Sequence, residues 1–162
     1  MRVNLFGELQ EAPFMGQTPK ANTVEWGTPQ ELFDKLNEEF HFTLDPCASD
    51  LNHKCDKYYT KEANGLIQDW TGEVVFCNPP YGREIYDWAA KCHYEWKEHN
   101  VTVVMLIPAR TDTRWFHDYI YHQAEIDFLR GRLAYTCEGG NSQKAPFPSM
   151  IVIFRAKEAQ DE

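Results

Sequence analysis

Short apolar runs alternate with amphipathic stretches along residues 25–155, and this pattern predicts strands separated by helices. The run at 101–107 (VTVVMLI) is almost unbroken, which is typical of a central parallel strand buried on both faces. The run at 74–77 (VVFC) is cut off by two prolines and predicts a buried strand that ends in a rigid turn. Four shorter segments also favour strands, at residues 42–44, 57–60, 126–129 and 150–154.

Three helices are predicted between these strands. Thr28-Pro29-Gln30-Glu31 has the pattern of a capping box with proline at the first helical position, and apolar residues on one face continue this helix to Phe40. Apolar spacings of three and four predict a second helix over residues 84–99. A third helix is predicted from the apolar positions Trp115, Phe116, Tyr119 and Ile120. We therefore expect an α/β fold with a mainly parallel sheet, helices on both faces and antiparallel strands at one edge.

Composition favours one folded domain. The chain has 162 residues, of which 43% are hydrophobic and 14% aromatic, enough for one substantial core and few for two domains. Residues 1–22 mix glycine, proline and polar residues without a lasting period and predict a flexible N-terminal arm, from which Phe6 and Phe14 can dock on a surface. Residues 23–157 form the predicted domain, and residues 158–162 a polar tail.

The sequence also predicts a cytosolic protein without a metal. No apolar run approaches the ~18 residues of a membrane span, and the first residues lack the apolar core of a signal peptide. Five cysteines, an odd number at irregular spacing, fit a reducing compartment. Cys47, His53 and Cys55 lie close together in the sequence, but structural zinc needs four well-spaced ligands, so no metal is expected.

The charge distribution bears on possible nucleic-acid binding. A formal net charge of −9 is unusual for such a protein, because phosphate contacts need a basic surface. The charge is uneven, however. Residues 1–40 hold seven acids and three cations, whereas the second half contains the cations Arg110, Arg114, Arg130, Arg132 and Lys144. We expect a local basic rim on an acidic body, with weak, salt-sensitive binding.

Asn78-Pro79-Pro80-Tyr81 directly follows the 74–77 strand and is the strongest chemical signal in the chain. Open α/β folds place their chemistry at such strand ends. Asparagine offers an acceptor and donors on one planar group, proline keeps its carbonyl but lacks an N–H, and tyrosine has a flat face with a polar tip. Together they can hold an exocyclic amino group and stack on its ring, while a Pro-Pro turn without function is the plain alternative.

The tetrapeptide resembles the catalytic motif of amino-group methyltransferases that use S-adenosylmethionine. Over residues 23–155, the chain resembles the phage-type DNA N6-adenine methyltransferases of the Dam group. The motifs that carry this resemblance are Trp26-x-Thr28-Pro29, Asp45-Pro46-Cys47-Ala48-Ser49, Asn64-Gly65-Leu66, Asn78-Pro79-Pro80-Tyr81, Leu106-Ile107-Pro108-Ala109-Arg110 and Arg130-Gly131-Arg132-Leu133. The resemblance implies a single-domain, Rossmann-like class I fold and direct methyl transfer to the N6 amino group of a flipped-out adenine in double-stranded DNA.

The resemblance also implies roles for individual residues. The catalytic group comprises Asn78, Pro79, Pro80 and Tyr81. The residues matched to binding of S-adenosylmethionine, which leaves as S-adenosylhomocysteine, are Trp26, Thr28, Pro29, Asp45, Pro46, Cys47, Asn64, Gly65, Leu66 and Asn78. The candidates for DNA phosphate contacts are Arg83, Arg110, Arg114, Arg132 and Lys144.

The chain also departs from the family pattern. Only 33 positions separate Asp45 from Asn78, too few for a full helix-strand-helix unit. No clear acidic residue ends a second strand to bind ribose hydroxyls, and Asp50 and Asp56 are the candidates. No insert has the size of a target-recognition domain, so sequence specificity must come from short loops such as 137–148 or be modest.

Other functions stay open at this point. RNA bases or protein glutamine are alternative substrates, since enzymes acting on them share the tetrapeptide. Pro46-Cys47 mimics the Pro-Cys pair of cytosine-C5 methyltransferases, although its place early in the chain is wrong for a nucleophile. An inactive binding module that keeps the fold would suit the acidic charge. The sequence also leaves open the DNA target, the choice between monomer and homodimer, and the biological purpose, for instance protection from restriction.

Overall fold

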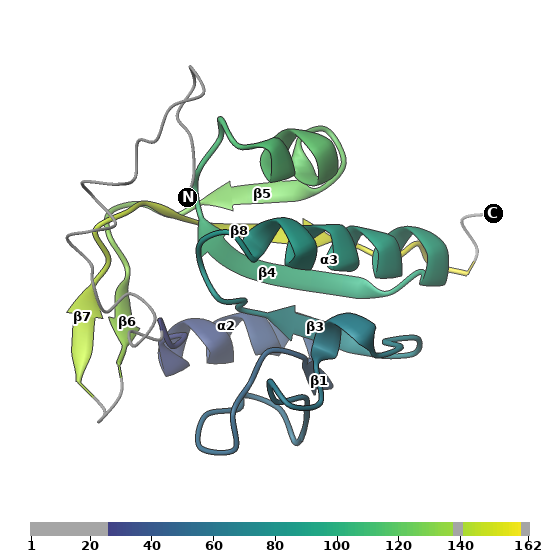
Figure 1. Cartoon of the computed structure of the whole chain (residues 1–162), viewed down its shortest axis with the longest axis horizontal. Coiled ribbons are helices and arrows are strands. Elements are labelled where there is room, and N and C mark those ends of the chain that lie inside the picture. The colour runs from purple at the N-terminus through teal and green to yellow at the C-terminus, as the bar shows by residue number, and fades with distance from the viewer. Residues whose placement is uncertain (1–25, 138–140, 160–162) are drawn as a thin grey trace.

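A six-stranded sheet forms the centre of the molecule in the computed structural model, which describes residues 26–137 and 141–159 (Figure 1). Its strands, in the spatial order β2-β1-β3-β4-β8-β5, are β1 (Leu44–Asp45), β2 (Lys57–Tyr58), β3 (Val74–Cys77), β4 (Thr102–Pro108), β5 (Glu125–Phe128) and β8 (Ser149–Phe154). Neighbouring strands from β2 to β4 pair in parallel, whereas β8 is antiparallel to both β4 and β5. The mainly parallel sheet predicted from the sequence is confirmed.

The prediction of antiparallel strands at one edge of the sheet is confirmed, because the edge strand β5 and its neighbour β8 pair antiparallel to each other. The single antiparallel strand of this sheet, β8, lies inside it, and the edge strand β5 runs in the same direction as β4. Side-chain character explains this placement. Five of the six residues of β8 are buried, as an interior strand requires, whereas β5 (EIDF) is exposed at every position except the half-buried Ile126.

Helices cover both faces of the sheet, as predicted. On one face, α3 (Ile85–His99) packs on alternate residues of β4, including Val103 and Met105. On the other face, Phe33 of α2 (Gln30–Phe40) packs with Val104 and Leu106. Because successive side chains of a strand point to opposite faces, β4 contributes to both cores, which confirms the prediction of a strand buried on both sides.

The third predicted helix is present as a short π-helical segment, η3 (Phe116–Ile120), with Trp115 as its N-cap residue. One prediction about the helices needs correction. The capping box at the start of α2 does not form: Pro29 is the N-cap residue, and no side chain caps the helix. The hydroxyl of Thr28 instead accepts a hydrogen bond from Asn78 at 3.0 Å, so a tertiary contact replaces the predicted local one.

A β-hairpin that the sequence did not reveal stands at the carboxyl end of the parallel strands (Figure 1, left). It consists of β6 (Ala134–Thr136) and β7 (Ser142–Lys144), within a region that reads as a loop rich in glycine and proline. Gly27 forms an antiparallel bridge to Thr136. This bridge joins the hairpin to the chain segment before α2. The hairpin is thus stabilised by a segment far away in the sequence.

The segment between β1 and β3 is short, as expected. It holds the two-residue strand β2 and the 3-10 turn η2 (Gly65–Ile67). The predicted N-terminal arm, with Phe6 and Phe14, lies outside the described residues, as does part of the predicted tail. In the described part of the chain, no helix has the length and apolar character needed to cross a membrane.

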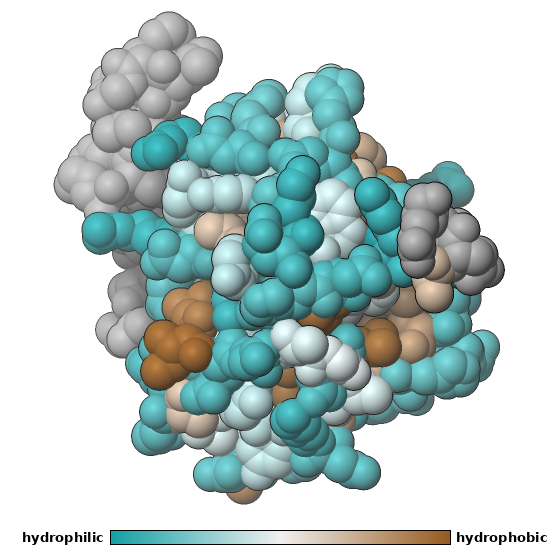
Figure 2. All heavy atoms as spheres, turned by 90° about the vertical axis from the view of Figure 1, so that its right-hand side faces the viewer, coloured by the Kyte–Doolittle hydropathy of each residue, from teal (hydrophilic) through white to brown (hydrophobic). Residues whose placement is uncertain are grey.

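The two ends of the sheet differ in surface character. Figure 2 views the end away from the hairpin, where the surface is mainly hydrophilic with small, separate hydrophobic areas. Two cations at this end are paired: Lys57 with Glu73, which precedes β3, and Arg155 with Glu125 at the start of β5. The opposite end carries Asn78, which directly follows β3, and the five candidate cations.

Candidate active site

The side chain of Asn78, directly after β3, is held in one orientation. Its Nδ2 donates to the main-chain oxygen of Trp26 at 2.7 Å and to the hydroxyl oxygen of Thr28 at 3.0 Å. Both hydrogens of the amide are thus used, which leaves Oδ1 as the free end of the group. Oδ1 is buried and has no partner among the described residues. A buried acceptor is costly to leave without a partner, so Oδ1 stands out among the polar atoms of the described residues.

Tyr81 is anchored by its hydroxyl. This group donates to the main-chain oxygen of Leu106 in β4 at 3.0 Å and lies 3.2 Å from the hydroxyl of Tyr135. Burial and the neighbouring Tyr135 hydroxyl raise the pKa of Tyr81 well above its ordinary value, so the phenol stays neutral at physiological pH. Between Asn78 and Tyr81, Pro79 is buried and Pro80 exposed. The tetrapeptide therefore has fixed ends and a rigid, N–H-free centre.

Asp45 organises the loop that follows β1. Its buried carboxylate accepts hydrogen bonds from the main-chain nitrogens of Lys54 (2.9 Å) and Cys47 (3.3 Å). Burial raises the pKa of Asp45, and these two hydrogen bonds oppose that shift. Asp45 therefore gives the loop 46–54 its shape at the carboxyl end of β1, beside β3.

The loop after β1 is closely packed against Gly65. A Cβ atom at residue 65 would lie 2.2 Å from the main-chain oxygen of Pro46, so only glycine fits there. Asn64 has a positive φ of 57°, and its side chain accepts a hydrogen bond from the nitrogen of Leu66. Two motifs that are far apart in the sequence thus form one surface at the carboxyl end of β1.

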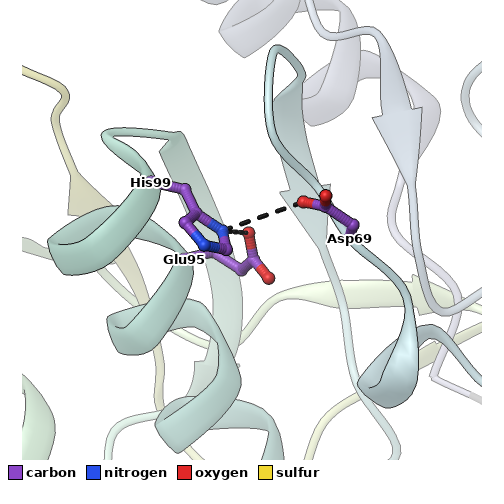
Figure 3. Close-up of side chains that lie close together, drawn as sticks. All are labelled: Asp69, Glu95 and His99. Atoms are coloured by element: carbon purple, nitrogen blue, oxygen red, sulfur yellow. Dashed lines mark hydrogen bonds and ion pairs between the residues drawn. The ribbon is translucent and has the colours of Figure 1, made fainter.

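A buried carboxylate supports this surface from behind. Glu95 of α3 accepts a hydrogen bond from the nitrogen of Trp70, and the indole Nε1 of Trp70 donates to the oxygen of Gly65 at 3.0 Å. Figure 3 shows Glu95 and His99 of α3 facing Asp69, with His99 Nδ1 2.8 Å from Glu95 Oε1. Although these three side chains have the spacing of metal ligands, the ammonium of Lys91 lies 2.7 Å from Glu95 Oε2 and would repel a cation. We interpret the group as structural.

The two candidate acids for a ribose contact lie at different ends of β2. Asp56 precedes the strand and is therefore at its amino end. Asp50 lies in the loop after β1, where the hydroxyl of Tyr58 donates to its carboxylate at 2.9 Å. Of these two acids, only Asp50 lies at the carboxyl end of the parallel strands, where Asn78 also lies.

The five candidate cations all come from segments at the carboxyl end of the sheet. Arg83 follows β3, Arg110 and Arg114 follow β4, Arg132 follows β5, and Lys144 ends β7. All are exposed except the half-buried Arg110. The guanidinium of Arg114 lies 5.1 Å from the centre of the Tyr86 ring, and Arg83 lines an open hollow of ≈ 550 Å³ with Glu84 and Asp87. The five candidate cations thus share one end of the sheet.

The cysteines and His53 do not form a metal site in the described part of the chain. His53 Nδ1 lies 2.9 Å from the main-chain oxygen of Cys55, and its ring stacks on Tyr58. Burial raises the pKa of Cys55 to about 12, whereas zinc binds the thiolate. Cys47 is half-buried beside Asp45.

Several residues of the site escaped the sequence analysis: Gly27, Leu106, Tyr135, Thr136 and Ser149. Leu106 stands in a motif that the sequence analysis quoted, yet its main-chain oxygen is what binds Tyr81. The other four have no local signal, because their importance comes from partners far away in the sequence, such as Tyr81 for Tyr135.

Comparisons with known proteins agree on one family. Residues 15–161 match the family model described as DNA N-6-adenine-methyltransferase (Dam). A protein of Escherichia phage T1 named DNA N-6-adenine-methyltransferase is 36% identical over 124 residues, which is 75% of this chain and 51% of that protein. A protein of the same name from Haemophilus phage HP1 is 30% identical over 145 residues, 86% of this chain and 83% of that protein. The chain thus spans about half the length of the phage T1 relative and most of the phage HP1 relative.

Proposed function

This chain belongs to the DNA N-6-adenine-methyltransferase (Dam) family, and on that premise we propose that it transfers the methyl group of S-adenosylmethionine to N6 of adenine in DNA. The sheet of parallel strands, with helices on both faces, is compatible with the Rossmann-like class I fold that we propose for it. A cytosolic location stays a prediction of the sequence.

The unpaired Oδ1 of Asn78 is the observation that carries this proposal. The N6 amine of adenine is a poor nucleophile because its lone pair is delocalised into the ring. Asn78 Oδ1 and the carbonyl oxygen of Pro79 would accept its two hydrogens and favour a more tetrahedral nitrogen, which frees the lone pair for attack. Because Trp26 and Thr28 already hold Nδ2, the acceptor needs no reorientation when the base arrives.

Tyr81 would stack on the adenine ring and fix the line of attack. Its hydroxyl is tied to Leu106, so the ring is already immobilised. The target amine lies inside a DNA duplex, and the base must therefore leave the stack, at a cost of a few kcal/mol. We propose that contacts of the protein with the base and with phosphates offset that cost.

The residues that would hold S-adenosylmethionine lie around Asn78 and the loop after β1. When bound, this cofactor supplies an electrophilic methyl group and is left as S-adenosylhomocysteine. The close packing of Gly65 on Pro46 supports a shaped surface for it, and small residues in the loop 46–49 allow close approach. Trp26, Thr28 and Pro29 would also contact the cofactor. The carboxylate of Asp50, which accepts a hydrogen bond from the Tyr58 hydroxyl, would accept hydrogen bonds from the ribose hydroxyls.

The test of this function compares three substrates. We expect tritium from labelled S-adenosylmethionine to appear in unmethylated DNA, and nucleoside analysis to identify N6-methyladenine. RNA and total protein are assayed in parallel as alternative acceptors. Label in RNA or protein without label in DNA would contradict the proposal, and 5-methylcytosine as the product would point to Cys47 instead.

The basic rim predicts how DNA binding depends on salt. Each phosphate contact contributes a slope of about −0.9 in a plot of log K against log salt for duplex DNA. Lys144→Ala should therefore reduce the magnitude of that slope by about one. Lys57→Ala is the matched control, because Lys57 is exposed at the other end of the sheet and pairs with Glu73. Equal slopes for Lys144→Ala and the wild type would exclude Lys144 from the DNA interface.

A further inference from the structure

Two consecutive residues of the β6–β7 hairpin, Tyr135 and Thr136, contact the groups that hold Asn78 and Tyr81. Neither catalytic candidate lies on the hairpin, and the sequence separation is 54 residues between Tyr81 and Tyr135. The hairpin is thus linked to both ends of the Asn78–Tyr81 tetrapeptide.

The first link runs through the main chain. The nitrogen of Gly27 donates to the oxygen of Thr136 at 2.8 Å, and the nitrogen of Thr136 donates to the oxygen of Gly27 at 2.9 Å. Gly27 stands between Trp26 and Thr28, the two acceptors of Asn78 Nδ2. A Cβ atom on Gly27 would lie 2.7 Å from the oxygen of Thr136, so this approach requires glycine.

The second link runs through side chains. Tyr135 is completely buried, and its hydroxyl lies 2.8 Å from Ser149 Oγ and 3.2 Å from the hydroxyl of Tyr81. The rings of Trp26, Tyr81 and Phe147 all contact the Tyr135 ring, at centroid distances of 5.5, 6.1 and 5.9 Å. A displacement of Tyr135 would therefore change its contacts with both Tyr81 and Trp26.

The outer strand of the hairpin faces solvent. All three residues of β7 are exposed, and they pair directly with β6: Gln143 with Tyr135, and Ser142 with Thr136. Lys144, a candidate for phosphate contact, ends this strand. A molecule bound to β7 thus lies one strand away from the residues that orient Asn78 and Tyr81.

We propose that the β6–β7 hairpin is a positioning element that couples DNA contact to the geometry of Asn78 and Tyr81, with Tyr135 and Thr136 as positioning residues. This inference rests on the proposed function. It predicts that hairpin changes act mainly on the rate of methyl transfer and leave cofactor affinity unchanged.

Tyr135→Phe tests the coupling, because it removes the hydroxyl and keeps the ring. We expect kcat to fall about tenfold, the size of one lost hydrogen bond, while the dissociation constant of S-adenosylmethionine changes less than about twofold. The matched control is Tyr119→Phe, which removes a tyrosine hydroxyl that lies 3.3 Å from another tyrosine, Tyr86, away from the hairpin. In a double-mutant cycle, Tyr135→Phe and Lys144→Ala should be non-additive in kcat.

Amide hydrogen exchange supplies a readout that does not depend on activity. The Gly27 amide, which donates to Thr136, should exchange faster in Tyr135→Phe than in the wild type and in Tyr119→Phe. Wild-type kcat and exchange in Tyr135→Phe, or strict additivity with Lys144→Ala, would overturn the inference. A wild type that fails to methylate DNA overturns the proposed function instead, and the exchange experiment still decides whether the hairpin holds the 26–28 segment.

Discussion

Replacing Asn78 with alanine is expected to lower the rate of methyl transfer by a factor of about 100 to 1000 and to leave binding of S-adenosylmethionine largely intact. The substitution removes Oδ1, the buried acceptor without a partner, together with the Nδ2 group that Trp26 and Thr28 hold. Without this acceptor, the adenine amine loses the interaction that would draw its lone pair out of conjugation. The loss should therefore fall on the chemical step.

Single-turnover rates with saturating DNA measure the chemical step, and calorimetry measures cofactor binding. Asn37→Ala is a matched control, because Asn37 is also half-buried and its side chain makes one hydrogen bond, to the nitrogen of Phe42 near the end of α2. It should lose some stability and keep the wild-type rate. A wild-type rate in Asn78→Ala, or a parallel loss of cofactor binding and rate, would refute the assignment of Asn78.

Replacing Gly65 with alanine is expected to weaken cofactor binding by about tenfold to 100-fold. The added Cβ would lie 2.2 Å from the main-chain oxygen of Pro46, and neither atom can move without its backbone, so the two segments must separate. Overpacking of this kind costs about 1–3 kcal/mol, and about 1.4 kcal/mol corresponds to a factor of ten in affinity. Because Asp45-Pro46 and Asn64-Gly65 share this contact, the surface proposed for the cofactor would lose its shape.

Calorimetric titration with S-adenosylmethionine and thermal unfolding distinguish this effect from a general loss of stability. Gly72→Ala is the control: its φ of +85° strains any other residue, but no atom lies within 4 Å of the added Cβ. Gly72→Ala should cost about 1 kcal/mol of stability and keep its cofactor affinity. Equal affinities in Gly65→Ala and Gly72→Ala would show that the Pro46 contact has no role in binding.

Local patterns predicted the strands and helices well where burial and periodicity agreed. The run 74–77 corresponds to β3, and the amphipathic segment 84–99 corresponds to α3 within one residue. The third helix is also found where its apolar positions predicted it, although they did not reveal that it is a π-helix. The position of β8 inside the sheet was not predictable, since its apolar run says only that it is buried and not which strand lies beside it.

The capping box shows how a correct local rule can be overridden. Threonine before proline favours a side-chain cap, but Pro29 is the N-cap residue and the Thr28 hydroxyl accepts a hydrogen bond from Asn78. Such a contact joins residues 50 positions apart, so no window along the chain contains both partners.

The sequence by itself determined the family of this protein, the alternation of strands and helices, and the residue types gathered at the strand ends, because these depend on local periodicity and on the order of motifs. The tertiary structure alone decided the orientation of Asn78, the anchoring of Tyr81, the position of β8 and the existence of the β6–β7 hairpin. These features depend on hydrogen bonds and packing between segments distant in the chain, whose energies are realised only once the sheet brings those segments together.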